Sequence, residues 1–139
     1  MREAPEQAVA LAARHILVVD NETALAEYLR EVLLVREYRV SVFTNPQTAL
    51  TADQQNPLSY GALTTDQTLP GLSGLELVRK VRGINPRLPV MLASGYSNVI
   101  DSASAGALGA QRFFQKPYQV RPLIEQLVSL LVGHDQAPI

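Results

Sequence analysis

Residues 16–22 read ILVVDNE, a short apolar run followed at once by three polar residues. The run is rich in β-branched side chains and does not alternate between apolar and polar positions, which is typical of a strand buried on both faces of a parallel sheet. Similar runs recur at residues 40–43, 61–65, 89–93 and 112–115. The sequence therefore predicts five short strands, of which the third and the fifth have the weaker patterns.

Stretches with a helical spacing of apolar residues separate these runs. The first contains Leu25, Leu29 and Val32, and the last contains Leu123 and Leu127. Each stretch presents one apolar face to a core. Strands that alternate with helices predict an α/β fold with right-handed crossovers and a parallel sheet covered on both faces.

Turn and capping residues indicate where several helices begin. The pair Asn45-Pro46 predicts the cap and first turn of the second helix, over about residues 46–54. A turn at Pro70-Gly71 precedes a third helix, which begins at Gly74. Residues 103–110 are nearly all small, so the fourth helix buries little side-chain area and is predicted to be loosely held.

Length and composition limit the class of protein. A chain of 139 residues fits one domain, expected over residues 15–132, with residues 1–14 as an extension or linker remnant and residues 133–139 as a tail. The absence of cysteine excludes disulfides, thiolate nucleophiles and sulfur-based zinc sites. A net charge of -1 without a basic cluster argues against direct binding to nucleic acid.

The chain has no run of about 20 apolar residues and no secretory apolar core near its start. Membrane insertion is therefore not expected. Together with the lack of cysteine, this pattern predicts a cytoplasmic protein.

Polar residues stand where four of the predicted strands end. In chain order they are Asp20-Asn21-Glu22, Asp66-Gln67, Ser94-Gly95 and Lys116-Pro117. In a parallel α/β sheet, ligands bind at the carboxyl ends of the strands, so these groups are expected to converge. Carboxylates, a hydroxyl and an ammonium group suit a divalent cation and a phosphoryl group, and a carboxylate beside such a cation can attack phosphorus to leave an acyl phosphate.

Four motifs in this order resemble the response-regulator receiver domain of two-component signalling. They are ILVVDNE at 16–22, TDQTLPGLSGLEL at 65–77, LASGY at 92–96 and QKP at 115–117. The resemblance covers about residues 15–132. It implies a flavodoxin-like, doubly wound (βα)5 fold with a five-stranded parallel sheet in the order 2-1-3-4-5 and helices on both faces.

The resemblance also assigns a reaction and a metal site. Asp66 would accept a phosphoryl group from the phosphohistidine of a histidine kinase or a histidine phosphotransfer protein, and the modified domain would switch a protein-interaction surface. Mg²⁺ would be held by Asp20, Asn21, Asp66 and the backbone carbonyl of Thr68. Asp20 or Asn21 could also cap the helix that follows.

Three further positions carry expected roles in this resemblance. Ser94 would hydrogen-bond the phosphoryl oxygens as the switch hydroxyl, and Lys116 would contact the same oxygens with its ammonium group. Phe113 matches the aromatic switch, although a core strand would also carry phenylalanine. The Lys116-Pro117 peptide bond is expected to be cis.

Asn21 departs from the family, which usually has a second acidic residue at this position. An amide oxygen still binds a hard cation, but the site loses one negative charge and should bind Mg²⁺ less tightly, with adjacent Glu22 as a partial compensation. A pseudo-receiver that acts only as a protein-interaction module therefore stays open as the alternative. The domain is not expected to be a classical enzyme by itself.

Other classes fit the sequence less well. A haloacid-dehalogenase-like phosphatase needs an Asp-x-Asp-x-Thr/Val pattern, which residues 20–24 break at the third and fifth positions. A nucleotide-binding fold needs a glycine-rich or hydroxyl-rich loop after the first strand, where acidic residues would repel phosphate. Residues 69–76 and 94–97 resemble receivers attached to hybrid sensor histidine kinases, which slightly favours a domain excised from a longer protein.

Overall fold

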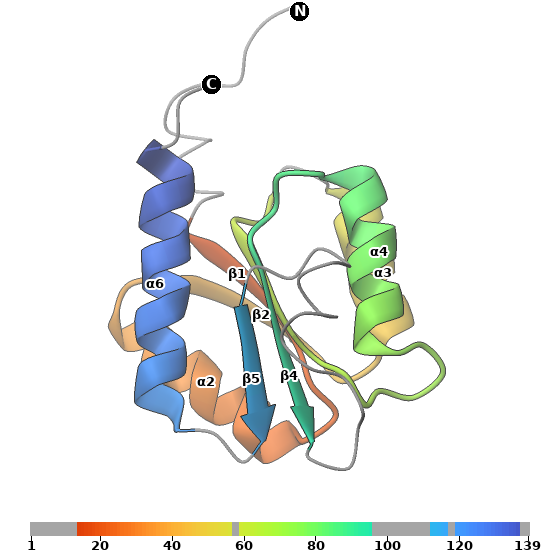
Figure 1. Cartoon of the computed structure of the whole chain (residues 1–139), viewed down its shortest axis with the longest axis horizontal. Helices are drawn as coiled ribbons and strands as arrows, with labels where there is room; N and C mark the ends of the chain where they lie inside the picture. The colour runs from red at the N-terminus through yellow and green to blue at the C-terminus, as the bar shows by residue number, and fades with distance from the viewer. Residues whose placement is uncertain (1–13, 57–58, 96–111, 117–118, 137–139) are drawn as a thin grey trace, which may run out of the picture.

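The described part of the chain forms one parallel sheet between two layers of helices (Figure 1). The structure is a computed structural model and describes residues 14–56, 59–95, 112–116 and 119–136. Its strands are β1 (His15–Val19), β2 (Arg39–Phe43), β3 (Ala62–Asp66), β4 (Val90–Gly95) and β5 (Arg112–Lys116). Its helices are α2 (Thr23–Val35), α3 (Pro46–Gln55), α4 (Gly74–Ile84) and α6 (Val120–Gln136).

The strands lie in the order β2-β1-β3-β4-β5, and every neighbouring pair is parallel. This confirms the predicted flavodoxin-like topology. The central strand β3 is buried along its whole length, as expected of a strand that is covered on both faces. Because all strands run in the same direction, their carboxyl ends lie along one edge of the sheet, where the predicted polar residues stand.

Two hydrophobic clusters fill the spaces between the sheet and the helices. Helices α2 and α6 cover one face of the sheet, where Leu29 and Leu127 pack with Val18. Helices α3 and α4 cover the other face, where Leu77 packs with Leu17 (Figure 1). No helix in the described ranges is long and apolar enough to cross a membrane.

The helix starts agree with the sequence in two cases and differ in one. Asn45 caps α3 by accepting a hydrogen bond from the backbone N–H of Gln47, with Pro46 in the first turn. Helix α4 begins at Gly74 as predicted. The N-cap position of α2 is held by Glu22, without a capping hydrogen bond from its side chain, so neither Asp20 nor Asn21 holds this position. The carboxylate of Asp20 instead accepts the backbone N–H of Glu22 at 2.8 Å, because the chain turns out of β1 before the helix begins.

Two predictions fall on residues outside the described ranges. They are the helix at residues 103–110 and the cis peptide bond between Lys116 and Pro117.

Candidate functional site

The carboxyl ends of β1, β3 and β5 bring four charged side chains together. The ammonium group of Lys116, the last residue of β5, lies 3.0 Å from Oδ2 of Asp20 and 3.3 Å from Oδ2 of Asp66. The shortest of its contacts is 2.6 Å, to Oε1 of Glu22. The Lys116 ammonium thus contacts three carboxylates, which come from the ends of two different strands.

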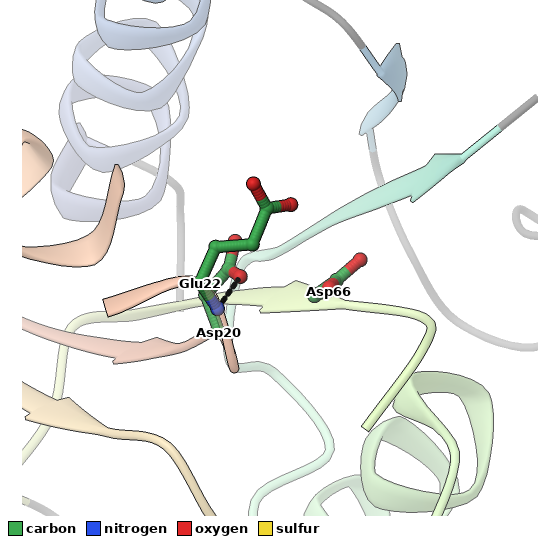
Figure 2. Close-up of side chains that lie close together, drawn as sticks. All are labelled: Asp20, Glu22 and Asp66. Carbon is green, nitrogen blue, oxygen red and sulfur yellow. Dashed lines mark hydrogen bonds between the residues drawn. The ribbon is translucent and has the colours of Figure 1, made fainter. Parts of the chain in front are cut away.

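Burial divides these carboxylates into two kinds. Asp20 and Asp66 are each only 4% exposed, whereas the side chain of Glu22 is 59% exposed. Figure 2 shows Asp20 and Glu22 where the chain leaves β1, and Asp66 at the end of β3. One oxygen of Asp66, Oδ1, is buried and has no hydrogen-bond partner within the described parts of the chain. A buried carboxylate oxygen without a donor is costly, so this atom is suited to a ligand that approaches from outside.

The local electrostatics raise the pKa of two groups. Burial raises the pKa of the Asp66 carboxyl above its ordinary value, and the nearby charge of Asp20 adds to this, while Lys116 and a hydrogen bond from the Thr68 backbone partly offset it. Burial alone would lower the pKa of Lys116, but its hydrogen bonds to Glu22 and Asp20 and the charges of Asp20 and Asp66 raise it above the ordinary value. The ammonium therefore stays charged and compensates part of the acidic cluster.

The backbone beside Asp66 is fixed by the loop that leads into α4. The N–H of Gln67 donates to the carbonyl of Ala93 on β4 at 2.8 Å, and the Gln67 carbonyl accepts the N–H of Gly74 at 2.9 Å. The side-chain oxygen of Gln67 accepts the N–H of Leu75 at 2.9 Å. At the other end of the loop, Ser73 and Glu76 form a capping box that sets where α4 begins. Asp66 thus projects from a rigid connection between a central strand and a capped helix.

Gly74 is required in this connection because nothing larger fits. A Cβ atom at Gly74 would lie 2.3 Å from the Asp66 carbonyl oxygen and 2.8 Å from Cα of Gln67. We expect Gly74→Ala to lower the free energy of unfolding by about 2–3 kcal/mol, since backbone atoms would have to shift.

Chemical denaturation measures this effect, and Gly83→Ala is the matched control on the same helix. A Cβ at Gly83 would meet nothing within 4 Å, so this variant should be neutral or slightly more stable. Equal stabilities for the two variants would mean that the loop beside Asp66 is not constrained as described.

The structure locates the other predicted site residues as follows. Ser94 is buried in β4, one residue beyond the Ala93 that pairs with Asp66, and its hydroxyl donates to the Gly95 carbonyl at 3.3 Å. Thr68 is exposed, and its backbone hydrogen-bonds the Asp66 carboxylate. Asn21 is exposed next to the cluster. Phe113 is half-buried against the core cluster under α3 and α4 and pairs in register with Leu92.

The donor set fits a hard divalent cation. Asp20, Glu22 and Asp66 each offer a carboxylate oxygen, and these three atoms lie within 4.8 Å of one another. Oxygen ligands of this kind are what Mg²⁺ prefers, and it keeps several of its waters. The orphaned Oδ1 of Asp66 is consistent with such a ligand. The resemblance implies Asp20, Asn21, Asp66 and the Thr68 carbonyl as ligands of Mg²⁺, with Glu22 only as a partial compensation. The structure places the Glu22 carboxylate beside those of Asp20 and Asp66.

Comparison with known proteins agrees with this arrangement. Residues 16–128 match the family of the response regulator receiver domain. The chain belongs to this family. The receiver domain is a module of two-component signalling, and the acidic cluster stands at the edge of the sheet where the sequence motifs predicted it.

The relatives of this chain differ in length, so the match covers a different share of each. The transcriptional regulatory protein FixJ of Bradyrhizobium diazoefficiens is 30% identical over 105 residues, which are 76% of this chain and 50% of FixJ. The response regulator receiver protein CpdR of Brucella abortus is 27% identical over 120 residues, which are 86% of this chain and 98% of CpdR. This receiver domain therefore spans about half the length of FixJ but nearly all of CpdR.

A solved structure supports the same fold. The CheY-like response regulator receiver domain protein from Methanospirillum hungatei JF-1 superposes with a TM-score of 0.80 at 25% identity, over 89% of this chain and 98% of that one.

Proposed function

We propose that this receiver domain accepts a phosphoryl group on Asp66 from the phosphohistidine of a histidine kinase or a histidine phosphotransfer protein, in a reaction that requires Mg²⁺. The observation that carries the proposal is the buried Oδ1 of Asp66, which has no donor among the described residues and lies on a carboxylate that also contacts Lys116. Asp66 ends a strand at the sheet edge where α/β proteins bind ligands.

In this proposal Asp66 is the nucleophile. An oxygen of its carboxylate forms a bond to phosphorus while the bond between phosphorus and the histidine nitrogen breaks, and the electron pair of that bond stays on the imidazole. Lys116 lies 3.3 Å from Oδ2 of Asp66, close enough to neutralise charge on the transferred oxygens. The buried hydroxyl of Ser94 supplies a further donor to the same oxygens.

The cation would be held by Asp20, Asn21, Asp66 and the Thr68 carbonyl. When bound, Mg²⁺ neutralises charge that develops on the phosphoryl group. The side chains of Asp20 and Asp66 share one ammonium group, so their mutual repulsion is balanced before a cation arrives. Ser94 and Phe113 would then carry the change to a protein-interaction surface.

The proposal is tested by incubating the purified chain with millimolar Mg²⁺ and a small acyl phosphate donor, followed by intact-mass measurement. We expect the mass to increase by one phosphoryl group, and the increase to be lost when EDTA removes the cation. No increase with Mg²⁺ present would favour the alternative, a pseudo-receiver that acts by protein interaction alone.

Asn21→Asp tests whether residue 21 faces the cation. The change adds a negative charge, and at about 4 Å from a divalent cation in water such a charge is worth about 2 kcal/mol, so we expect Mg²⁺ to bind about tenfold to thirtyfold more tightly. The variant should be less stable than the parent without metal, because the new carboxylate stands beside buried Asp20 and Asp66. Calorimetric titration and thermal unfolding in EDTA measure the two effects. Equal affinities would show that Asn21 does not face the cation.

A further inference from the structure

Glu22 makes the closest contact to Lys116 although it is the least buried carboxylate of the cluster. Its Oε1 atom is 2.6 Å from the ammonium, compared with 3.0 Å for Asp20 and 3.3 Å for Asp66. The backbone of Glu22 is also held in place, since it occupies the N-cap position of α2 and its N–H donates to Asp20 at 2.8 Å. Fixing an exposed side chain in one rotamer costs conformational entropy, and one exposed ion pair contributes little stability in return. Stability alone therefore does not account for this contact.

The other two partners of Lys116 are the carboxylates that the cation needs. A divalent cation held by Asp20 and Asp66 would neutralise much of their charge and repel the ammonium, so these two contacts of Lys116 would weaken when the site is filled. Glu22 also lies within reach of a cation, but it is the exposed member of the cluster and the closest to the ammonium, so it is the carboxylate that can stay with Lys116.

On this basis, and resting on the function proposed above, we propose that Glu22 is a positioning residue for Lys116. It keeps the ammonium beside the acidic cluster when a cation weakens its contacts with Asp20 and Asp66. Lys116 then faces the incoming phosphoryl oxygens rather than solvent. Asn21 stands where the family usually has a second acidic residue, so the site lacks one negative charge. Glu22 supplies a negative charge in its place, which stabilises the filled site through Lys116.

The lysine content of the chain allows a direct test. Lys80 and Lys116 are its only lysines, and Lys80 is exposed on α4. Incorporation of ¹⁵N-labelled lysine followed by NMR of the ammonium groups therefore reports on Lys116. The Lys80→Arg variant removes the signal of Lys80, so the signal that remains belongs to Lys116. With saturating Mg²⁺ we expect a distinct, slowly exchanging Lys116 signal in the parent protein and loss of that signal in Glu22→Gln. We also expect Glu22→Gln to bind Mg²⁺ about twofold to fivefold more weakly than the parent. Glu27→Gln on α2, which removes an exposed pair with Arg30, is the matched control and should change neither result.

A variant that moves the charge separates a positioning role from a general acidic one. Asn21→Asp combined with Glu22→Gln keeps the net charge of the cluster. We expect it to recover Mg²⁺ affinity but not the Lys116 signal. Recovery of both, or a Lys116 signal in Mg²⁺-loaded Glu22→Gln equal to that of the parent, would overturn the inference alone. Absence of saturable Mg²⁺ binding in the parent would overturn the proposed function as well.

Discussion

Asp66→Asn should abolish phosphorylation by a small phosphodonor, with a loss of about two orders of magnitude or more, because an amide oxygen is a very poor nucleophile compared with a carboxylate. The variant should still fold. Burial raises the pKa of the Asp66 carboxyl, so its removal also removes a buried charge that the fold accommodates at a cost. Intact-mass measurement over time gives the rate, and the free energy of unfolding shows that the protein is intact.

Asp53→Asn is the matched control for this experiment. Asp53 is also a buried aspartate, but it lies on α3 rather than at the end of a strand. The Asp53→Asn variant should be phosphorylated at the same rate as the parent protein. A folded Asp66→Asn protein that still gains a phosphoryl group would show that another residue is the acceptor.

The same Asp53→Asn change should raise the stability of the protein. Asp53 is fully buried, and neither of its carboxylate oxygens has a hydrogen-bond partner in the described residues. Burial raises the pKa of Asp53 to about 6. Keeping this group charged at pH 7.5 costs about 1–3 kcal/mol, so the variant should be more stable by about that amount.

The pH dependence of this gain has a defined sign. Between about pH 4 and 6 the folded chain retains a proton on Asp53 that the unfolded chain has lost, so the free energy of unfolding falls as the pH rises through this window. The difference between parent and variant should therefore be near zero at about pH 4 and reach its full value above about pH 6. Denaturant titrations at several pH values measure it, and Glu31→Gln, at an exposed position on α2, should show no such trend. A constant difference across the range would mean that folding does not raise the pKa of Asp53.

Much of the fold follows from local patterns that tertiary contacts do not override. The ILVV run at residues 16–19 lies within β1, and all four of these residues are fully buried because helices cover both faces of the sheet. The weak third run proved to be the fully buried strand β3, in which Thr64 and Thr65 take positions that apolar residues usually fill. Threonine fits there because its β-branched side chain suits a strand.

The parts of the site that the sequence could not supply depend on side-chain geometry. The strand-end rule brought Asp20, Asp66 and Lys116 to one edge of the sheet, as found. It could not show that Glu22 turns back toward Lys116, because that depends on how the chain leaves β1 and where α2 begins. Nor could it show that Asp53 is buried, since α3 has the least apolar sequence of the predicted helices and its inward face carries a carboxylate.

The central claim is that one aspartate, Asp66, accepts the phosphoryl group. The most direct test is to identify the modified residue. After reaction with the phosphodonor and Mg²⁺, borohydride reduces an aspartyl phosphate to homoserine, and peptide fragmentation then identifies the residue that changed. The account predicts homoserine at position 66, and its absence when EDTA is present. A label at Asp20, Glu22 or Ser94 with position 66 unmodified, or labelling that does not depend on Mg²⁺, would contradict it.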